Sequence, residues 1–172
     1  DMQEEVAAGV VGACGGRVAD SWEALVATDL DIVVVATTHD ALAEISTAAL
    51  KAGKHVLCEK PLGRNPGEGQ MAVAAAAESG KVLKVGYNHR YHPAIQKVYE
   101  VCHAGEIGSL ISVRGRYGHG GRPGYDREWR AIPAKAGGGE LLDQGAHLID
   151  LAKWLLGDFA EVKGYVETHF WD

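Results

Sequence analysis

The chain has 172 residues, 47% of them apolar and 23% charged, which is typical of a globular protein with one domain or parts of two. Its formal net charge of −6 argues against a nucleic-acid groove, because phosphate binding requires a basic stripe. There is no basic leader and no run of about 18 apolar residues, so no membrane partner is expected. The three cysteines are far apart, which favours reduced thiols and a cytoplasmic protein.

The first half of the chain alternates helical and strand patterns. Helices are predicted over residues 1–14, 21–26, 41–52 and 67–79. Runs of apolar residues, typical of strands that a parallel sheet covers on both faces, occupy 31–36, 55–58 and 82–87. Strands about 25 residues apart with helical crossovers indicate a doubly wound parallel sheet.

The pattern changes near residues 88–93, where we expect a boundary between one domain at 1–90 and a second at 91–172. In the second domain, helices are predicted over 93–104 and 140–156 and strands over 110–117 and 162–170. The strand at 110–117 alternates apolar and polar residues, which favours an antiparallel sheet with one wet face. Residues 118–135 form a long loop with little periodicity, and loops of this length are often functional.

The triplet Glu59-Lys60-Pro61 follows the predicted strand at 55–58. It therefore lies at the carboxyl edge of the sheet, where open α/β sheets bind ligands. Taken alone, the triplet is also consistent with a surface salt bridge before a turn. The preceding Cys58 is expected to be a buried strand cysteine rather than a reactive one.

The helix predicted over 140–156 carries a narrow polar stripe that includes Asp143 and His147. These residues are four apart, so their side chains can reach a common point. The stripe is consistent with a solvated helix face on which the two residues pair, and equally with a proton-transfer pair. The three glycines at 137–139 favour the second interpretation, because glycine permits close approach of a ligand.

Four segments occur in order along the chain: AGKHVLCEKPLG, VGYNHRYHP, GEIG and GGGELLDQGAHLIDLAKWLLG. Together they resemble the Gfo/Idh/MocA family of nicotinamide-dependent oxidoreductases, and the resemblance extends over essentially all 172 residues. It implies an α/β fold: a partial Rossmann-type parallel sheet, followed by the start of an α+β domain with an open, mostly antiparallel sheet. Residues 1–90 would then bind the dinucleotide, and residues 91–172 would serve substrate binding and oligomerisation.

The resemblance also implies roles for individual residues. Lys60 would lie near the nicotinamide and the reacting hydroxyl, His147 would be the general acid/base, and Asp143 would be the substrate-side carboxylate. The implied cofactor-binding residues are Asp1, Ala36, Thr37, His39, Asp40, Glu59, Lys60, Asn88 and Arg90. The implied substrate-binding residues are Lys60, Trp129, Arg130, Asp143 and His147. For Trp129 and Arg130, a packed loop anchor is an equally good interpretation.

The chain departs from the family pattern at both ends. No GxGxxG fingerprint occurs, so we expect an internal piece of a longer protein whose phosphate loop lies before residue 1 and whose second sheet continues after residue 172. Asp1 then matches the acid that binds the ribose hydroxyls, which favours NAD over NADP.

The function implied is hydride transfer between NAD(P) and a secondary alcohol of a sugar, polyol or related cyclic substrate. The alternatives are an NAD-dependent glycosidase of the same family and a non-catalytic, truncated relative that binds a sugar or a partner protein. A homo-oligomer of the full-length protein is possible by resemblance. No metal site is predicted, because the candidate ligands lack a carboxylate or thiol at ligand spacing; these candidates are His89, His92, His119 and His169.

Overall fold

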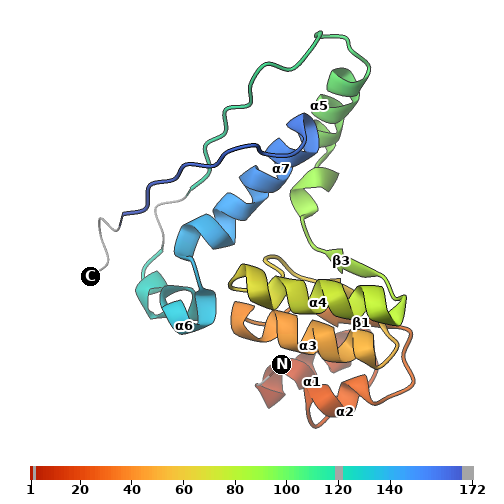
Figure 1. The fold of residues 1–172 in the computed structure, drawn as a ribbon. Helices are drawn as coiled ribbons and strands as arrows, with labels where there is room; N and C mark the ends of the chain where they lie inside the picture. The colour runs from red at the N-terminus through yellow and green to blue at the C-terminus, as the bar shows by residue number, and fades with distance from the viewer. Residues whose placement is uncertain (2, 119–121, 168–172) are drawn as a thin grey trace. The chain divides into compact units, whose positions relative to one another are not determined.

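A computed structural model describes residues 1, 3–118 and 122–167 (Figure 1). The chain folds into two compact units, residues 1–85 and residues 86–172. The division between them falls after Val85, at the end of the last strand of the first unit.

The first unit is built on a three-stranded parallel sheet in the order β1-β2-β3. The strands are β1 (Ile32–Val35), β2 (His55–Cys58) and β3 (Leu83–Val85). Helix α3 (His39–Lys51) joins β1 to β2, and α4 (Pro66–Ser79) joins β2 to β3. The two helices lie side by side (Figure 1). The predicted β-α-β-α-β order and parallel sheet are therefore confirmed.

Local hydrogen bonds fix where the helices of this unit begin. Helix α2 (Trp22–Val26) is capped by Ser21, whose Oγ accepts a hydrogen bond from the backbone N–H of Ala24 at 3.1 Å. At the start of α4, the side chain of Asn65 accepts from the backbone N–H of Glu68 at 3.0 Å. The N-terminal helix α1 (Glu4–Cys14) buries none of its residues.

The core of the first unit lies on one face of the sheet. Residues Val33, Val35, Val56 and Cys58 point into it and pack with Leu42, Ile45 and Leu50 of α3 and Ala75 of α4. On the opposite face, Ile32 and Val34 are 61% and 65% exposed. The prediction of strands covered on both faces is therefore wrong for the residues described, because side chains alternate along a strand and these helices cover one set.

In the described residues of the second unit, all the regular elements are helices or helical turns. The unit contains the short turns η1 (Asn88–Tyr91), η2 (Tyr125–Arg127) and η3 (Trp129–Ala131), and the helices α5 (Pro93–His103), α6 (Pro133–Ala136) and α7 (Ala146–Leu156). The predicted helix over 140–156 is regular only from Ala146, because the π-helical turn η4 (Leu141–Gly145) precedes it. Two apolar residues of this segment are exposed, Leu141 at 56% and Ile149 at 49%.

The predicted antiparallel strands are not formed within the described part of this unit. Residues 110–117 and 162–167 have no strand hydrogen bonding, and Ile111 is 97% exposed. Residues 168–170, the end of the second predicted strand, lie outside the described residues. A strand requires a ladder of hydrogen bonds to a neighbour, and these segments have no such neighbour among the residues described. The long loop predicted at 118–135 instead contains η2, η3 and the start of α6.

Candidate active site

In the first unit, two segments of predicted site residues leave the sheet at the same edge. Strands β1 and β2 are parallel and Val35 pairs with Cys58, so residues 36–40 and 59–60 follow neighbouring strand ends. The backbone N–H of Glu59 donates to the carbonyl of Val35 at 2.8 Å, which extends the pairing past the strand. Ala36, Thr37 and Glu59 are exposed and Lys60 is half-buried. This edge offers small side chains, an acid and a base to a ligand.

The residues just after the Glu-Lys-Pro triplet pack closely on helix α4. The peptide bond between Lys60 and Pro61 is cis. The carboxylate of Glu59 accepts the backbone N–H of Lys60 at 3.2 Å. A Cβ atom on Gly63 would lie 2.7 Å from Cβ of Glu68, so this position has no room for a side chain. The segment that follows Lys60 therefore lies close against helix α4 at Gly63.

Two of the predicted cofactor residues after β1 are partly or fully buried. His39, the first residue of α3, is 3% exposed. Asp40 is half-buried and its Oδ1 accepts a hydrogen bond from the hydroxyl of Thr38 at 2.5 Å. The exposed part of this segment is thus Ala36 and Thr37. Cys58, just before Glu59, is fully buried, and burial raises the pKa of its thiol, which confirms a buried strand cysteine.

The remaining predicted cofactor residues lie elsewhere in the two units. Asp1 is exposed, and its carboxylate accepts the backbone N–H of Gln3 at 2.8 Å. Asn88 and Arg90 belong to η1 in the second unit. The guanidinium of Arg90 makes a bidentate ion pair with Asp150, with N–O distances of 2.7 and 2.5 Å. Arg90 is therefore engaged with helix α7 of its own unit.

In the second unit, Asp143 and His147 are each only 5% exposed. Asp143 lies in the π-helical turn and His147 is the second residue of α7. The interpretation of a solvated polar stripe is therefore wrong, because neighbouring segments pack over both side chains. Turns of π-helix are frequent at functional sites, where they re-aim side chains.

The carboxylate of Asp143 is held by the predicted substrate residue Arg130. Nε of Arg130 lies 3.2 Å from Oδ2 of Asp143, and its guanidinium lies over the ring of Trp129 at 4.5 Å from the centroid. Glu128 also approaches this guanidinium, at 3.5 Å. Trp129 and Arg130 thus form part of the surroundings of Asp143 within this unit.

Aromatic rings surround His147, and sequence reasoning missed them as site residues. The ring of His89 stacks on that of His147, with centroids 3.8 Å apart and an interplanar angle of 11°. Tyr87 meets His147 edge-on at 6.2 Å, and Tyr117 lies 6.4 Å away. The segment VGYNHRYHP marks this region as part of the resemblance, but no spacing rule connects His89 or Tyr117 to His147 across the intervening chain.

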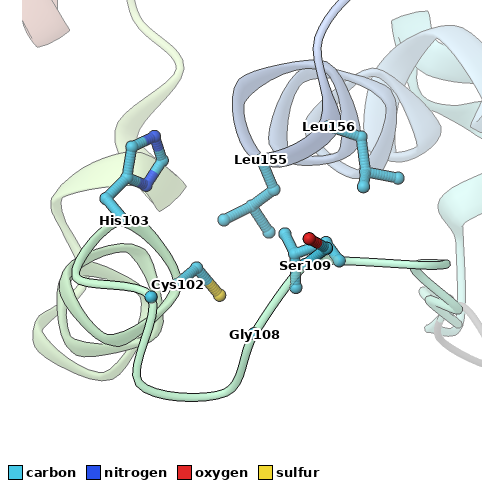
Figure 2. A pocket seen from close by; sticks show the side chains of 8 residues that line it. Cys102, His103, Gly108, Ser109, Leu155 and Leu156 are labelled. Atoms are coloured by element: carbon cyan, nitrogen blue, oxygen red, sulfur yellow. The ribbon is translucent and has the colours of Figure 1, made fainter.

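A cavity of about 510 Å³ opens in the second unit where α5 and α7 end (Figure 2). None of its lining residues is a predicted site residue; they are Cys102, His103, Gly105, Gly108, Ser109, Leu110, Leu155 and Leu156. Within the described ranges, no cluster of three or more histidine, cysteine, aspartate or glutamate side chains could hold a metal ion. His119 and His169 of the metal alternative lie outside those ranges.

Across the residues that the structure covers, none of the helices combines the length and apolar character needed to span a bilayer.

The comparisons with known proteins agree with the motifs in the sequence. The profile of the oxidoreductase family with an NAD-binding Rossmann fold matches residues 1–87, and the GFO/IDH/MocA C-terminal domain matches residues 95–172. Levoglucosan dehydrogenase of Pseudarthrobacter phenanthrenivorans is 36% identical over 142 residues, 81% of this chain and 36% of that protein. For 1,5-anhydro-D-fructose reductase of Ensifer adhaerens, the identity is 36% over 144 residues, 83% of this chain and 43% of that protein.

Solved structures give the same result. Levoglucosan dehydrogenase in complex with NADH and levoglucosan matches with a TM-score of 0.85 at 33% identity, over 92% of this chain and 44% of that chain. GenD2 from gentamicin A biosynthesis in complex with NAD matches with a TM-score of 0.76 at 32% identity, over 91% and 45%. The chain thus spans less than half of the length of these relatives. The chain belongs to the Gfo/Idh/MocA family of oxidoreductases.

Proposed function

We propose that the protein containing this chain transfers hydride between NAD(H) and a secondary alcohol of a sugar, polyol or related cyclic substrate. Its relatives support this class of substrate, since they are named for levoglucosan, 1,5-anhydro-D-fructose and inositol. Two related structures carry NADH or NAD, which supports the cofactor. We extend the proposal to NAD rather than NADP on the match of Asp1 to a ribose-binding acid. The cytoplasm is the proposed location, and a homo-oligomer is the proposed assembly.

The observation that carries the proposal is the burial of Asp143 and His147. Placing an imidazole and a carboxylate away from water costs free energy unless both are partnered, so a fold does not gain stability from them by default. Imidazole is the side chain best suited to exchange a proton near neutral pH. A buried histidine with a buried carboxylate four residues before it on the chain therefore suits general acid/base chemistry on a hydroxyl group.

The residues of this chain fit the nicotinamide end of the cofactor. The exposed Ala36 and Thr37 leave room beside the sheet edge, and Glu59 and Lys60 supply polar groups from the next strand. The 172 residues contain no GxGxxG loop for the pyrophosphate, so this chain supplies only part of the cofactor site.

Each of the three catalytic residues has a distinct proposed task. When bound, the nicotinamide supplies the hydride acceptor or donor. His147 takes the hydroxyl proton as the alcohol is oxidised and returns it in the reverse direction. The ammonium of Lys60 stabilises negative charge on the substrate oxygen. Asp143, held by Arg130, orients the substrate beside His147.

The test is turnover of the complete protein with NAD and a panel of cyclic polyols and anhydrosugars. We expect His147→Ala to lower kcat about 1000-fold and Lys60→Ala about 100-fold, with NADH binding retained. The controls are His103→Ala and Lys51→Ala, which remove an exposed residue of the same type from each unit. Full turnover in His147→Ala would refute the role of that residue, and failure of the wild type to bind NADH would refute the proposal as a whole.

A further inference from the structure

The ring of His89 lies closer to the ring of His147 than the rings of Tyr87 and Tyr117 do. The two rings are nearly parallel, at 11°, with centroids 3.8 Å apart, so their faces are in van der Waals contact. Tyr117 lies beside this stack, with its ring centroid 5.5 Å from that of His89 and 6.4 Å from that of His147. A flat ring thus covers one face of the proposed general acid/base.

The turn that carries His89 is tied to the helix that carries His147. Arg90, the next residue, pairs in bidentate fashion with Asp150, which lies three residues after His147 on α7. The same guanidinium lies 5.4 Å from the ring centroid of Trp154, one turn further along. The carbonyl of Arg90 also accepts a hydrogen bond from the side chain of Gln96. The contacts with Asp150 and Trp154 hold η1 against α7, and the hydrogen bond from Gln96 holds it against α5, so the turn that carries His89 is fixed.

The ring of a catalytic histidine needs a packed neighbour to hold its nitrogen atoms toward the substrate. The torsion between Cβ and the ring is broad and roughly two-fold, so a histidine side chain does not set the plane of its ring by itself. Proton transfer requires the reacting nitrogen within hydrogen-bond reach of the hydroxyl, and small misplacements lower the rate steeply. A stacked ring restricts the plane without forming a bond that the reaction would have to break.

We propose that His89 is a positioning residue that fixes the ring plane of His147 by stacking. This inference rests on the function proposed above. The flat ring of His89, rather than its nitrogen atoms, holds the plane of the His147 ring. A phenyl ring at position 89 should therefore substitute for the imidazole, and a methyl group should not.

The experiment compares His89→Phe with His89→Ala in the complete protein. We expect His89→Ala to lower kcat about tenfold and His89→Phe to stay within about twofold of the wild type. The KM for NAD should change less than about twofold in both. The matched control is His103→Ala, which removes a histidine stacked on Tyr99 at 3.7 Å and should leave kcat unchanged. Equal losses in the Phe and Ala variants, or no loss in His89→Ala, would overturn the proposal.

A second readout does not depend on activity. In the complete protein labelled at histidine, the ring protons of His147 should carry a ring-current shift that disappears in His89→Ala and persists in His89→Phe. An unchanged His147 spectrum in His89→Ala would overturn the stacking itself. If the wild-type protein oxidises no polyol or sugar, the proposed function fails. That failure can be told apart from failure of the stacking, because the spectrum of His147 reports the stacking without any turnover.

Discussion

The two units of the chain bury different kinds of residue. In the first unit the buried set is mainly apolar and gathers on one face of the sheet, around Leu42, Leu50 and Val35. Among the described residues of the second unit, the buried ones are Ala136, Asp143 and His147. Apolar burial stabilises a fold by about 25 cal/mol per Å², whereas burial of a charged or polar group costs free energy.

The residues that stabilise the fold by burial therefore lie mainly in the first unit, and the buried residues proposed for catalysis lie in the second. The first unit has a core that explains its fold, and its site residues at the sheet edge are exposed or half-buried except for His39, which is 3% exposed. The second unit places its predicted catalytic residues in its most protected positions. Four experiments test this contrast. They compare buried with exposed positions, stability with turnover, and neutral with acidic pH.

The largest effect is expected for Leu50→Ala. Leu50 is fully buried in the first-unit core, so its truncation should cost about 3 kcal/mol of unfolding free energy. The matched change Leu156→Ala, at a position 44% exposed in the second unit, should cost less than about 1 kcal/mol. Native-state hydrogen exchange of the β1 and β2 amides measures the cost of Leu50→Ala, and exchange of the α7 amides measures the cost of Leu156→Ala. Equal costs would remove the contrast between the units.

The next effect concerns turnover rather than stability. Asp143→Asn keeps the shape of the side chain but removes its charge, so we expect kcat of the complete protein to fall about 100-fold. The unfolding free energy should change by only about 1 kcal/mol, because its partner Arg130 is 35% exposed and can be hydrated. The control is Asp158→Asn, which breaks an exposed ion pair with Lys153. A large loss of stability without loss of turnover would contradict our interpretation.

Two adjacent valines of β1 test which face of the sheet is covered. Val35 is 2% exposed and Val34 is 65% exposed. Val35→Ala should cost about 2 kcal/mol and Val34→Ala about 0.5 kcal/mol, since only the first leaves a cavity. Urea unfolding of the two variants side by side gives the difference. A similar cost at both positions would mean that the second face is covered as well.

The smallest effect is a pH dependence at the start of α4. Hydrogen bonds from Arg64, at 2.6 Å for the shortest, lower the pKa of Glu68 in the folded chain. Stability from this pair is therefore present above the unfolded pKa of about 4.3 and is lost as pH falls through the lower folded pKa. The unfolding free energies of wild type and Glu68→Gln, obtained from urea titrations, should differ by about 1 kcal/mol or less at neutral pH and converge in acid. Arg64→Ala should also abolish this pH dependence, and its persistence would contradict the assignment.

The elements of the first unit could be predicted from the sequence because their signals are local. Ser21 and Asn65 cap helices within three residues, and the β-branched run at 32–35 can form little other than a strand. The order of these elements then leads to a parallel sheet, since helical crossovers return each strand in the same direction. The position of Glu59 and Lys60 at the carboxyl edge follows from that order.

The second unit was harder to predict, because its outcome depends on contacts between distant segments. Alternation at 110–117 is a real pattern, but a pattern makes a strand only when a neighbour completes the ladder. The burial of Asp143 and His147 could not be read from a polar stripe, because the covering residues Arg130 and His89 come from other segments.

The sequence by itself determined the parallel sheet, the family resemblance and the identity of the candidate residues, because periodicity, caps and ordered motifs are properties of neighbouring positions. Only the tertiary structure decided that one face of that sheet is covered, that Arg130 holds Asp143, and that His89 stacks on His147. Burial and ring contacts depend on which segments meet in space, and no spacing along the chain encodes that meeting.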